Sequence, residues 1–289
     1  MTLNIFRKGF NYSQDGPGNR LVYHLQGCNL HCAWCANPEG MAIKGTLMTT
    51  PAYLTDSVCP HGAIVQKEVD RERCASCVGQ ECVGKNRNQG ISFSAQVYTV
   101  ESLVAEARQS IPLYYDGGGV TLSGGEVTVQ FKAVRRLLQR LKEEGIHTAL
   151  ETNGAHPKLQ ELFPFTDYLI MDFKHHDDEK LKAATGANNR LIKRNVVAAL
   201  ENHPQLLIRI PLIAQFNDAD ADAYAFADFF RPLDTQQARF ELLPYHEYGK
   251  SKWAQCGLPY QIKNGHVSEA SLALFHTVFS ANQLNLIHT

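Results

Sequence analysis

The sequence feature that most constrains the fold of this chain is a set of six short apolar segments. Each is rich in β-branched or aromatic residues and ends in glycine or polar residues, which is typical of buried β-strands. They are too short and too evenly apolar to be amphipathic helices. The predicted strands cover residues 20–27, 119–126, 147–154, 167–174, 206–213 and 239–246.

Stretches with helical periodicity lie between these segments. Residues 131–145 carry four apolar side chains at helical spacing opposite charged ones, and Gly145 is a suitable C-terminal stop. Residues 99–110 predict a second amphipathic helix with Thr99 as its N-cap. Alternating strands and helices favour a parallel sheet or barrel with right-handed crossovers. Active residues are then expected at the C-terminal ends of the strands. The four apolar residues of the first helix are Val134, Leu137, Leu138 and Leu141.

Residues 45 to about 95 interrupt this pattern. The periodicity fails there, and four of the eight cysteines of the chain appear. We interpret the segment as a module inserted after the first strand. The expected division is residues 1–44 for the start of the main domain, 45–95 for the insert and 96–289 for the remainder.

Composition excludes several classes of protein. The 289 residues carry a formal net charge of −1, without the basic excess of a nucleic-acid-binding protein. No apolar run approaches the roughly 18 residues of a membrane span, and residues 1–19 lack the apolar core of a signal peptide. We therefore expect a cytoplasmic protein without a nucleic-acid or membrane partner, in which cysteines are metal ligands more often than disulfides.

Cys28, Cys32 and Cys35 fall within eight positions, in "GCNLHCAWCANPEG". Four thiolates complete the coordination of a [4Fe–4S] cluster, so three leave one iron open. An open position makes a metal site catalytic rather than structural. The alternative is a zinc knuckle with a distant fourth ligand, for which His24, His31 and Cys256 are the candidates.

The pattern C-x3-C-x-aromatic-C, with Trp34 as the aromatic residue, resembles the signature of the radical S-adenosylmethionine (SAM) enzymes. The resemblance implies that SAM binds the open iron through its amino and carboxylate groups. It also implies that one electron from the cluster breaks the 5′ C–S bond and yields a 5′-deoxyadenosyl radical. Trp34 and Ala36 are then expected beside the cofactor.

A second motif, "SGGE", ends the strand at 119–126. Gly124 and Gly125 permit close approach of the backbone. Taken alone it is a plain turn, but it matches the "GGE" motif of the family. The match implies that Glu126 meets the SAM amino group, although Val127 stands where the family usually has proline.

Two further strand ends resemble the glycyl-radical-enzyme activating enzymes within this superfamily. "ETNG" (151–154) looks like their "DTNG", and "MDFK" (171–174) like their "LDLK". The resemblance implies that Lys174 meets the SAM carboxylate. It also implies a monovalent or divalent cation near SAM, held by Glu151, Thr152 and Asp172. Glu151 is one methylene longer than the usual aspartate.

The same resemblance assigns three more residues. His246 lies in "LPYHEYGKSKW", similar to the subfamily's "LPYHxxGxxK", and is placed at the SAM site together with Arg209. "DGPGNR" resembles "DGPGIR", which implies that Asp15 lies where the partner protein docks. As a plain sequence feature that motif is a tight turn before a strand.

The insert carries a different set of cysteines. "CPHGAI" resembles the end of a bacterial ferredoxin cysteine run, in which the cysteine before proline ligates the cluster of the other run. The resemblance pairs Cys59 with Cys74, Cys77 and Cys82 in one auxiliary [4Fe–4S] cluster. A structural zinc site with the same four ligands is the alternative. Cys256 is left as a free thiol.

The resemblance predicts an α/β fold, an incomplete (β/α)6 radical SAM barrel with a small ferredoxin-like insert. It predicts an oxygen-sensitive oxidoreductase that contains SAM and two [4Fe–4S] clusters and receives electrons from flavodoxin or ferredoxin. Its activity would be to activate a glycyl radical enzyme by abstracting hydrogen from one glycine. The alternatives are a radical SAM reaction on a small molecule or peptide, and an iron–sulfur electron carrier without catalysis.

Overall fold

The structure is a computed structural model that describes residues 1–54, 59–75, 77, 81–85 and 90–289. Its centre is an eight-stranded sheet in the order β12-β11-β10-β9-β8-β2-β1-β7. The first six of these strands are parallel to one another, and β1 and β7 are antiparallel to their neighbours. The strands are β1 (Thr2–Tyr12), β2 (Asn19–Leu25), β7 (Gln96–Thr99), β8 (Gly119–Gly124), β9 (Thr148–Thr152), β10 (Tyr168–Asp172), β11 (Leu206–Leu212) and β12 (Ala238–Pro244).

All six predicted strands are therefore present, within a few residues of their predicted ends. The sequence did not predict β1 and β7, which extend the sheet beyond β2. The outer half of β1, from Lys8 to Tyr12, is largely exposed, so its apolar residues do not form a continuous buried run. The sheet does not close on itself, because β12 and β7 are its two edges.

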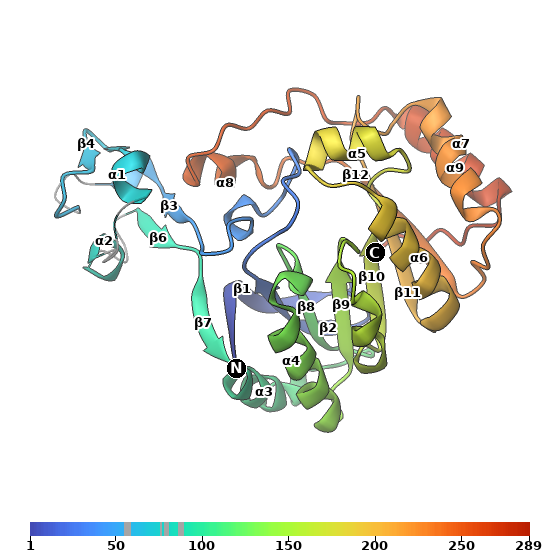
Figure 1. Cartoon of the computed structure of the whole chain (residues 1–289), viewed down its shortest axis with the longest axis horizontal. Helices are drawn as coiled ribbons and strands as arrows, with labels where there is room; N and C mark the ends of the chain where they lie inside the picture. Colours follow the sequence, from blue (N-terminus) through green and yellow to red (C-terminus); the bar gives the residue numbers. More distant parts are fainter. Residues whose placement is uncertain (55–58, 76, 78–80, 86–89) are drawn as a thin grey trace.

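Helices connect the parallel strands and cover one face of the sheet (Figure 1). The four apolar residues predicted to face inward from residues 131–145 are all fully buried. Thr99 caps α3 by accepting a hydrogen bond from the Ser102 N–H, and Gly145 has the positive φ of a helix stop. The helices of the main body are α3 (Val100–Gln109), α4 (Phe131–Glu143), α5 (Asp178–Thr185), α6 (Arg190–Asn202), α7 (Asp220–Phe230), α8 (Lys250–Gln255) and α9 (Glu269–Ala281).

The other face of the sheet has a small apolar cluster of its own. Ala149, Tyr168, Ile170 and Leu207 pack together there, and Ile287, from the segment after α9, packs against them. Because side chains alternate along a strand, neighbouring residues of β9 to β11 belong to the larger cluster under the helices. We call the face of Ala149 and Ile170 the inner face of the sheet.

The region of the predicted insert lies to one side of the sheet in Figure 1, opposite α7 and α9. It has its own apolar cluster of Leu54, Ile64, Cys82 and Ile91. The sequence boundaries at residues 45 and 95 stay a prediction. The described elements here are β3 (Leu47–Thr49), β4 (Ile64–Val65), β5 (Glu68–Val69), β6 (Ile91–Phe93), α1 (Arg71–Ala75) and α2 (Glu81–Lys85).

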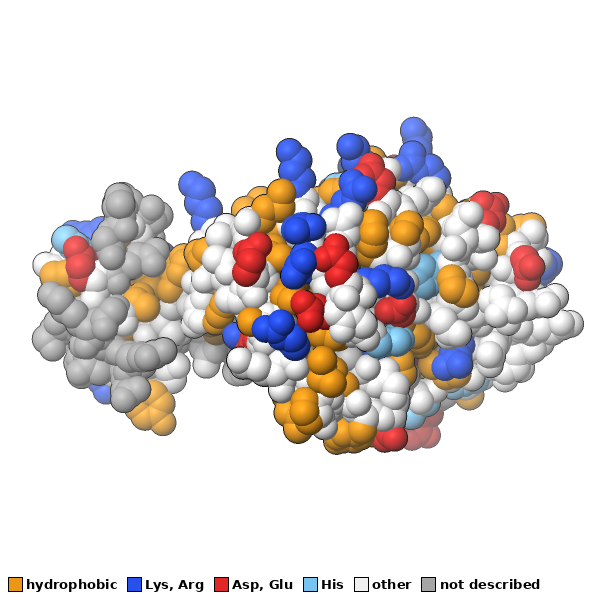
Figure 2. Space-filling view, turned by 90° about the horizontal axis from the view of Figure 1, so that it is seen from below, with side chains coloured by type: hydrophobic (Ala, Val, Ile, Leu, Met, Phe, Trp, Pro, Cys, Tyr) orange, Lys and Arg blue, Asp and Glu red, His pale blue; other side chains and the backbone are white. Residues whose placement is uncertain are grey.

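Short 3-10 helices complete the chain, and none of the described helices is long and apolar enough to cross a membrane. On the face drawn in Figure 2, basic and acidic side chains are mixed over the main body rather than gathered by sign. The 3-10 helices are η1 (Pro38–Gly40), η2 (Pro51–Tyr53), η4 (Ile111–Leu113), η5 (Val127–Gln130) and η6 (Leu159–Phe165).

Candidate active site

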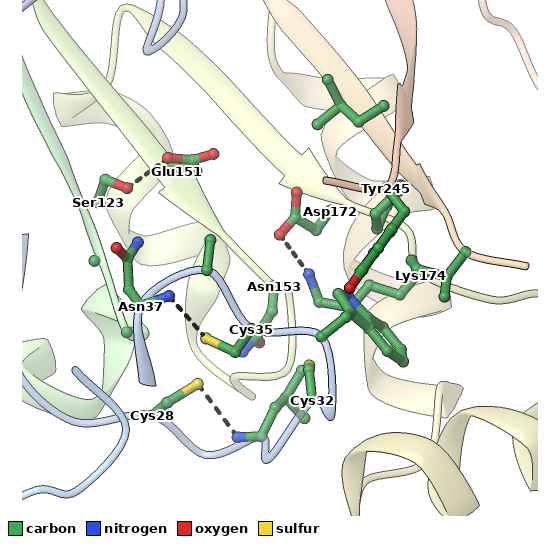
Figure 3. A pocket seen from close by; sticks show the side chains of 18 of the residues that line it. Cys28, Cys32, Cys35, Asn37, Ser123, Glu151, Asn153, Asp172, Lys174 and Tyr245 are labelled. Carbon is green, nitrogen blue, oxygen red and sulfur yellow. Dashed lines mark hydrogen bonds and ion pairs between the residues drawn. The ribbon is translucent and has the colours of Figure 1, made fainter. Parts of the chain in front are cut away.

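The loop with the first three cysteines leaves the C-terminal end of β2 and is held by its own backbone. The Cys28 N–H donates to the Met41 carbonyl, and the Cys35 N–H to the Cys32 carbonyl. Two sulfurs also accept backbone hydrogen bonds: Cys28 Sγ from the Leu30 N–H and Cys35 Sγ from the Asn37 N–H, both at 3.4 Å (Figure 3). These N–H groups would stabilise negative charge on the sulfurs.

The segment around α8 supports this loop from outside. Trp253 Nε1 donates to the Cys35 carbonyl at 2.9 Å, and Lys252 Nζ donates to the Ala36 carbonyl at 3.1 Å. Gly249 lies so close that a Cβ there would be 2.6 Å from the Cys35 oxygen. The "HEYGKSKW" stretch therefore positions the cysteine loop as well as lining the cavity.

A cavity of about 250 Å³ opens between the cysteine loop and the ends of five parallel strands, β8 to β12. Figure 3 shows Cys28, Cys32 and Cys35 on one side of it and Glu151, Asp172 and Lys174 on the other. Nearly all residues that the sequence placed at the cofactor lie together here. These lining residues include Trp34, Ala36, Gly124, Gly125, Glu151, Thr152, Asp172, Lys174 and His246.

None of the three candidate fourth ligands of a zinc knuckle lines this cavity. His24 is buried with Nε2 3.0 Å from Arg7 Nη2, and His31 is exposed. Cys256 is buried at the end of α8. The lining residues that the structure describes thus offer three thiols and no fourth cysteine.

The two glycines of "SGGE" allow the end of β8 to pack closely against the chain that leads into the cysteine loop. A Cβ on Gly124 would lie 2.2 Å from the Leu25 nitrogen, and one on Gly125 would lie 2.3 Å from the Gly27 oxygen. The Glu126 N–H donates to that same Gly27 carbonyl. Only glycine permits this approach, so the motif fixes the loop relative to the strand ends.

Glu126 itself is buried and is not among the residues that line the cavity. Its carboxylate accepts hydrogen bonds from Thr152 Oγ1 and from the backbone N–H groups of Thr128 and Asn153. Burial raises the pKa of this carboxyl, although those donors oppose the shift. Glu126 ties β8 to the "ETNG" turn, and Val127 is fully buried at the start of η5.

Lys174 and Asp172 form a close ion pair at the end of β10, with 2.5 Å between Nζ and Oδ2. Burial lowers the pKa of Lys174, but Asp172 and the Cys32 sulfur outweigh burial and raise it overall. Lys174 is therefore a charged ammonium in a cavity that also contains the cysteine sulfurs.

Arg209 does not line the cavity, because carboxylates on two sides occupy its guanidinium. Nη1 lies 2.8 Å from Glu151, and Nε lies 2.7 Å from Glu241. Glu151 also accepts from Ser123 Oγ at 2.5 Å. Burial raises the pKa of Glu151 to about 6, with Arg209 opposing the shift. No motif of the sequence pointed to Glu241, which lies within β12.

Asp15 lies outside the cavity lining as well. Its side chain accepts a hydrogen bond from Asn11, and its carbonyl accepts one from Thr121 Oγ1 at 2.7 Å. His246, in contrast, is exposed at the rim, where its ring stacks on Tyr248 with centroids 4.3 Å apart. Trp34 packs on Phe216, which the sequence did not single out.

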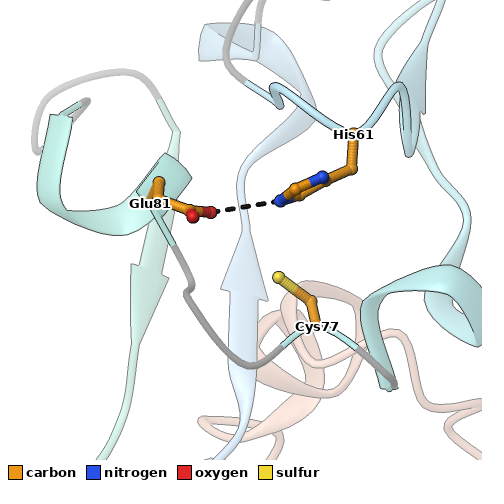
Figure 4. Close-up of side chains that lie close together, drawn as sticks. All are labelled: His61, Cys77 and Glu81. Carbon is orange, nitrogen blue, oxygen red and sulfur yellow. Dashed lines mark hydrogen bonds and ion pairs between the residues drawn. The ribbon is translucent and has the colours of Figure 1, made fainter.

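The four cysteines of the insert line a second cavity of about 620 Å³. Cys59, Cys74, Cys77 and Cys82 are joined there by His61 and Glu81. Figure 4 shows His61, Cys77 and Glu81 converging, with 3.2 Å between His61 Nε2 and the Glu81 carboxylate. Sequence reasoning missed His61, although it lies two positions after Cys59 in "CPHG".

Proteins of similar sequence and structure identify the family. Residues 22–227 match the Radical SAM superfamily. The chain is 32% identical over 286 residues to the 4-hydroxyphenylacetate decarboxylase activating enzyme of Clostridioides difficile (strain 630), covering 93% of this chain and 90% of that protein. It is 36% identical over 257 residues to the isethionate sulfite-lyase activating enzyme of Nitratidesulfovibrio vulgaris, covering 83% and 82%. A domain of pyruvate-formate lyase-activating enzyme from Bacteroides vulgatus matches with a TM-score of 0.50 and 26% identity, covering 59% of this chain and 98% of that one.

The chain therefore belongs to the radical SAM superfamily and, within it, to the activating enzymes of glycyl radical enzymes. The predicted family and α/β fold are confirmed. Membership implies SAM and one [4Fe–4S] cluster. The individual roles of the site residues, the auxiliary cluster, the cation and the electron donor stay predictions.

Proposed function

We propose that this chain activates a glycyl radical enzyme by reductive cleavage of SAM. When bound, a reduced [4Fe–4S] cluster supplies the electron that splits SAM into methionine and a 5′-deoxyadenosyl radical, which takes one hydrogen atom from a partner glycine. The products are 5′-deoxyadenosine and a glycyl radical. The relatives named above are activating enzymes for different partners, so their names do not select one partner for this chain.

The observation that carries the proposal is the three-thiol loop facing a cavity without a fourth cysteine among its described lining residues. This donor set fits a cluster with one open iron. Backbone N–H groups already point at two of the sulfurs, which suits thiolate ligands. An electron carrier needs four protein ligands, so the open set favours catalysis.

The wall opposite the cysteines supports SAM binding. Lys174 is the cation suited to the SAM carboxylate, and Asp172 holds its ammonium in place. Thr152 and Asn153 are fixed by their hydrogen bonds to Glu126. Glu126 thus acts as a positioning residue for the SAM wall. His246 lies at the exposed rim of the same cavity, which fits the role at the SAM site that its motif predicts.

We also propose that the four insert cysteines hold an auxiliary [4Fe–4S] cluster. Their convergence on one cavity supports this, as does the Ala63 N–H that donates to Cys59 Sγ at 3.4 Å. A four-thiolate cluster has no open iron, so it would serve electron transfer from flavodoxin or ferredoxin. Zinc on the same ligands is the alternative, and the colour and iron content of the protein separate the two.

A cation near SAM would have to compete with protein cations. Arg209 pairs with Glu151, and Lys174 pairs with Asp172, so both predicted acidic ligands already have a partner. The cation stays a prediction, best tested by comparing SAM affinity in potassium, sodium and choline chloride.

The function is tested with anaerobically reconstituted protein. Under reduction it should convert SAM into 5′-deoxyadenosine, measured by chromatography. Mixed with glycyl radical enzymes encoded near its gene, it should generate the doublet of a glycyl radical in electron paramagnetic resonance (EPR). Reconstituted brown protein that leaves SAM intact would overturn the proposal. SAM cleavage without any glycyl signal would favour a radical reaction on a small molecule or peptide.

A further inference from the structure

The segment after α9 turns back and runs along the free edge of the sheet. The Phe240 N–H of β12 donates to the Asn285 carbonyl at 2.9 Å, and the Ile287 N–H donates to the Phe240 carbonyl at 2.8 Å. Phe240 and Leu286 form a parallel bridge. In Figure 1 this part of the chain leaves α9 and ends over the strands near the β10 label. Residues 285–289 are called the strap below.

The strap enters the inner face of the sheet. Ile287 packs against the small apolar cluster formed by Tyr168, Leu207 and their neighbours. Thr289 donates two hydrogen bonds to the buried Glu241 carboxylate, from its N–H at 2.9 Å and from Oγ1 at 2.5 Å. The strap therefore covers a strip of the inner face beside β12, which is apolar where Ile287 lies and polar where Thr289 lies, and we call this strip the groove.

This groove leads to the candidate active site. Thr289 Oγ1 lies 3.5 Å from Arg209 Nη2, and Arg209 Nη1 lies 2.8 Å from the cavity residue Glu151. Leu243, two residues after Glu241 on the same face of β12, lines the cavity. Arg209 and Glu151 are therefore the side chains that lie between Thr289 of the strap and the cavity.

The strap is held by three hydrogen bonds of its backbone, by Leu286 on the main core, by Ile287 on the inner face and by the Thr289 hydroxyl. Contacts of this kind accept another extended segment of different sequence, as when a peptide adds to a sheet edge. Arg209, the cation nearest the end of the strap, is already paired with Glu151 and Glu241, so it offers no free charge to an acidic side chain. The groove therefore suits a segment without acidic side chains.

We propose that the strap is a displaceable internal ligand, and that an extended, uncharged segment of the partner protein replaces it in the groove during docking. This inference rests on the proposed function for the identity of the partner. The groove and its exchange can be tested without the partner.

The test uses a fluorescent peptide that copies residues 282–289, "NQLNLIHT". A shortened chain that ends at Leu284 should bind it in a saturable way by anisotropy, and the full chain should bind it at least tenfold more weakly. The same peptide with Ile287→Asp should lose at least tenfold in affinity. If the shortened chain does not melt cooperatively, full-length Ile287→Asp takes its place, since that change removes the apolar contact of the strap with the inner face.

The proposal would be overturned if a folded shortened chain bound the copied peptide no more tightly than it bound the Ile287→Asp peptide. So would an Ile287 amide that exchanges with deuterium as slowly as the central amides of β11, because the strap would then open only on global unfolding. Loosening the strap should leave reductive SAM cleavage within twofold and lower the KM for an activated partner at least threefold. Absence of SAM cleavage by the full chain would instead refute the proposed function. The peptide experiment would still show whether the strap can be displaced.

Discussion

The two cysteine regions of this molecule differ in how they are supported. Cys28, Cys32 and Cys35 sit on a loop held by β2, by the glycines after β8 and by Trp253. The insert cysteines are carried by turns and by helices of five residues around a separate, small apolar cluster. One region is part of the rigid sheet, and the other lies beside it.

The two regions also differ in their number of thiols: the loop at the sheet has three, and the insert has four. A reaction needs its groups held within a fraction of an ångström, and strand ends hold side chains more accurately than loops. A cluster that only relays electrons tolerates a looser support. The open three-thiol set therefore lies where precision is greatest, and the complete four-thiol set lies where it matters less.

Burial acts on thiols of both regions, and in the insert it raises the pKa of Cys74 and Cys82. Burial raises the pKa of Cys28, Cys32 and Cys35 each to about 12. These thiols release protons when they bind metal, so loading of the first site is favoured by higher pH.

The largest effect should come from removing one cysteine of each set. Cys35→Ala should abolish SAM cleavage and lower the iron content from about eight to about four per chain. Cys77→Ala should lower the iron content equally but keep SAM cleavage by a chemical reductant within about threefold, because its cavity is separate from the first. Iron analysis and 5′-deoxyadenosine formation measure both effects.

Cys256→Ala is the matched control, since Cys256 is buried but lines neither cavity. Its iron content and activity should equal those of the unmodified protein. If Cys77→Ala also abolished SAM cleavage by chemical reductant, the two regions would be one functional unit and the comparison would fail.

The second prediction concerns the cationic wall opposite the cysteines. Lys174→Gln should weaken SAM binding by roughly 30- to 150-fold, because a buried charge-assisted hydrogen bond contributes about 2–3 kcal/mol. Iron content should not change, since Lys174 is not a cluster ligand. Equilibrium dialysis with labelled SAM measures the affinity.

Lys250→Gln serves as the control for that experiment. Lys250 pairs with Glu247 on the surface, where ion pairs contribute little. Equal loss of affinity in both variants would show that the Lys174 effect is not specific to the cavity wall.

Much of the fold could be predicted because short stretches of the sequence carry a clear periodicity. The parallel strands are short apolar runs, and the helix at 131–145 has a strong period. The sequence did not predict β1 and β7 because their side chains are half exposed, and because β7 pairs with a strand that is distant in sequence. Half-exposed strands of this kind carry a weak apolar pattern.

The residues of the candidate site could be predicted where a motif lies at the C-terminal end of a strand. Parallel strands bring these ends together at one edge of the sheet. What the sequence could not show is which side chain faces which. Arg209 was placed at the cofactor, but its partner Glu241 lies 32 residues away and directs it elsewhere. The approach of Gly249 to Cys35 and the return of Ile287 to the sheet are equally long-range contacts.

The third prediction tests how closely the first region is supported. A Cβ on Gly249 would lie 2.6 Å from the Cys35 oxygen and 2.7 Å from Ala36 Cα. Gly249→Ala must therefore shift the cysteine loop, and we expect SAM cleavage to fall about tenfold at a stability cost of about 1–3 kcal/mol. Gly9→Ala is the control, because a Cβ there meets no atom within 4 Å. Unchanged cleavage in Gly249→Ala would show that the loop is no more rigidly held than the insert.

The smallest effect concerns two histidines, one from each region. His175, after β10, is fully buried, with Nδ1 accepting from the Asp177 N–H and Nε2 donating to the Phe216 carbonyl. Burial, helped by His176, lowers its pKa to about 4. The folded state therefore favours neutral His175, whose stabilisation is complete above pH 6.5 and is lost as the pH falls through about 4.

His175→Gln should remove this acid sensitivity. Between pH 7 and pH 4 its free energy of unfolding should fall by about 1–3 kcal/mol less than that of the unmodified protein, as measured by urea titration. His61→Gln, at a side chain of the insert that is 59% exposed beside Glu81, should change the free energy of unfolding at pH 7 by less than about 0.5 kcal/mol. If His175→Gln lost as much free energy of unfolding between pH 7 and pH 4 as the unmodified protein, the buried imidazole would not be the source of the acid sensitivity.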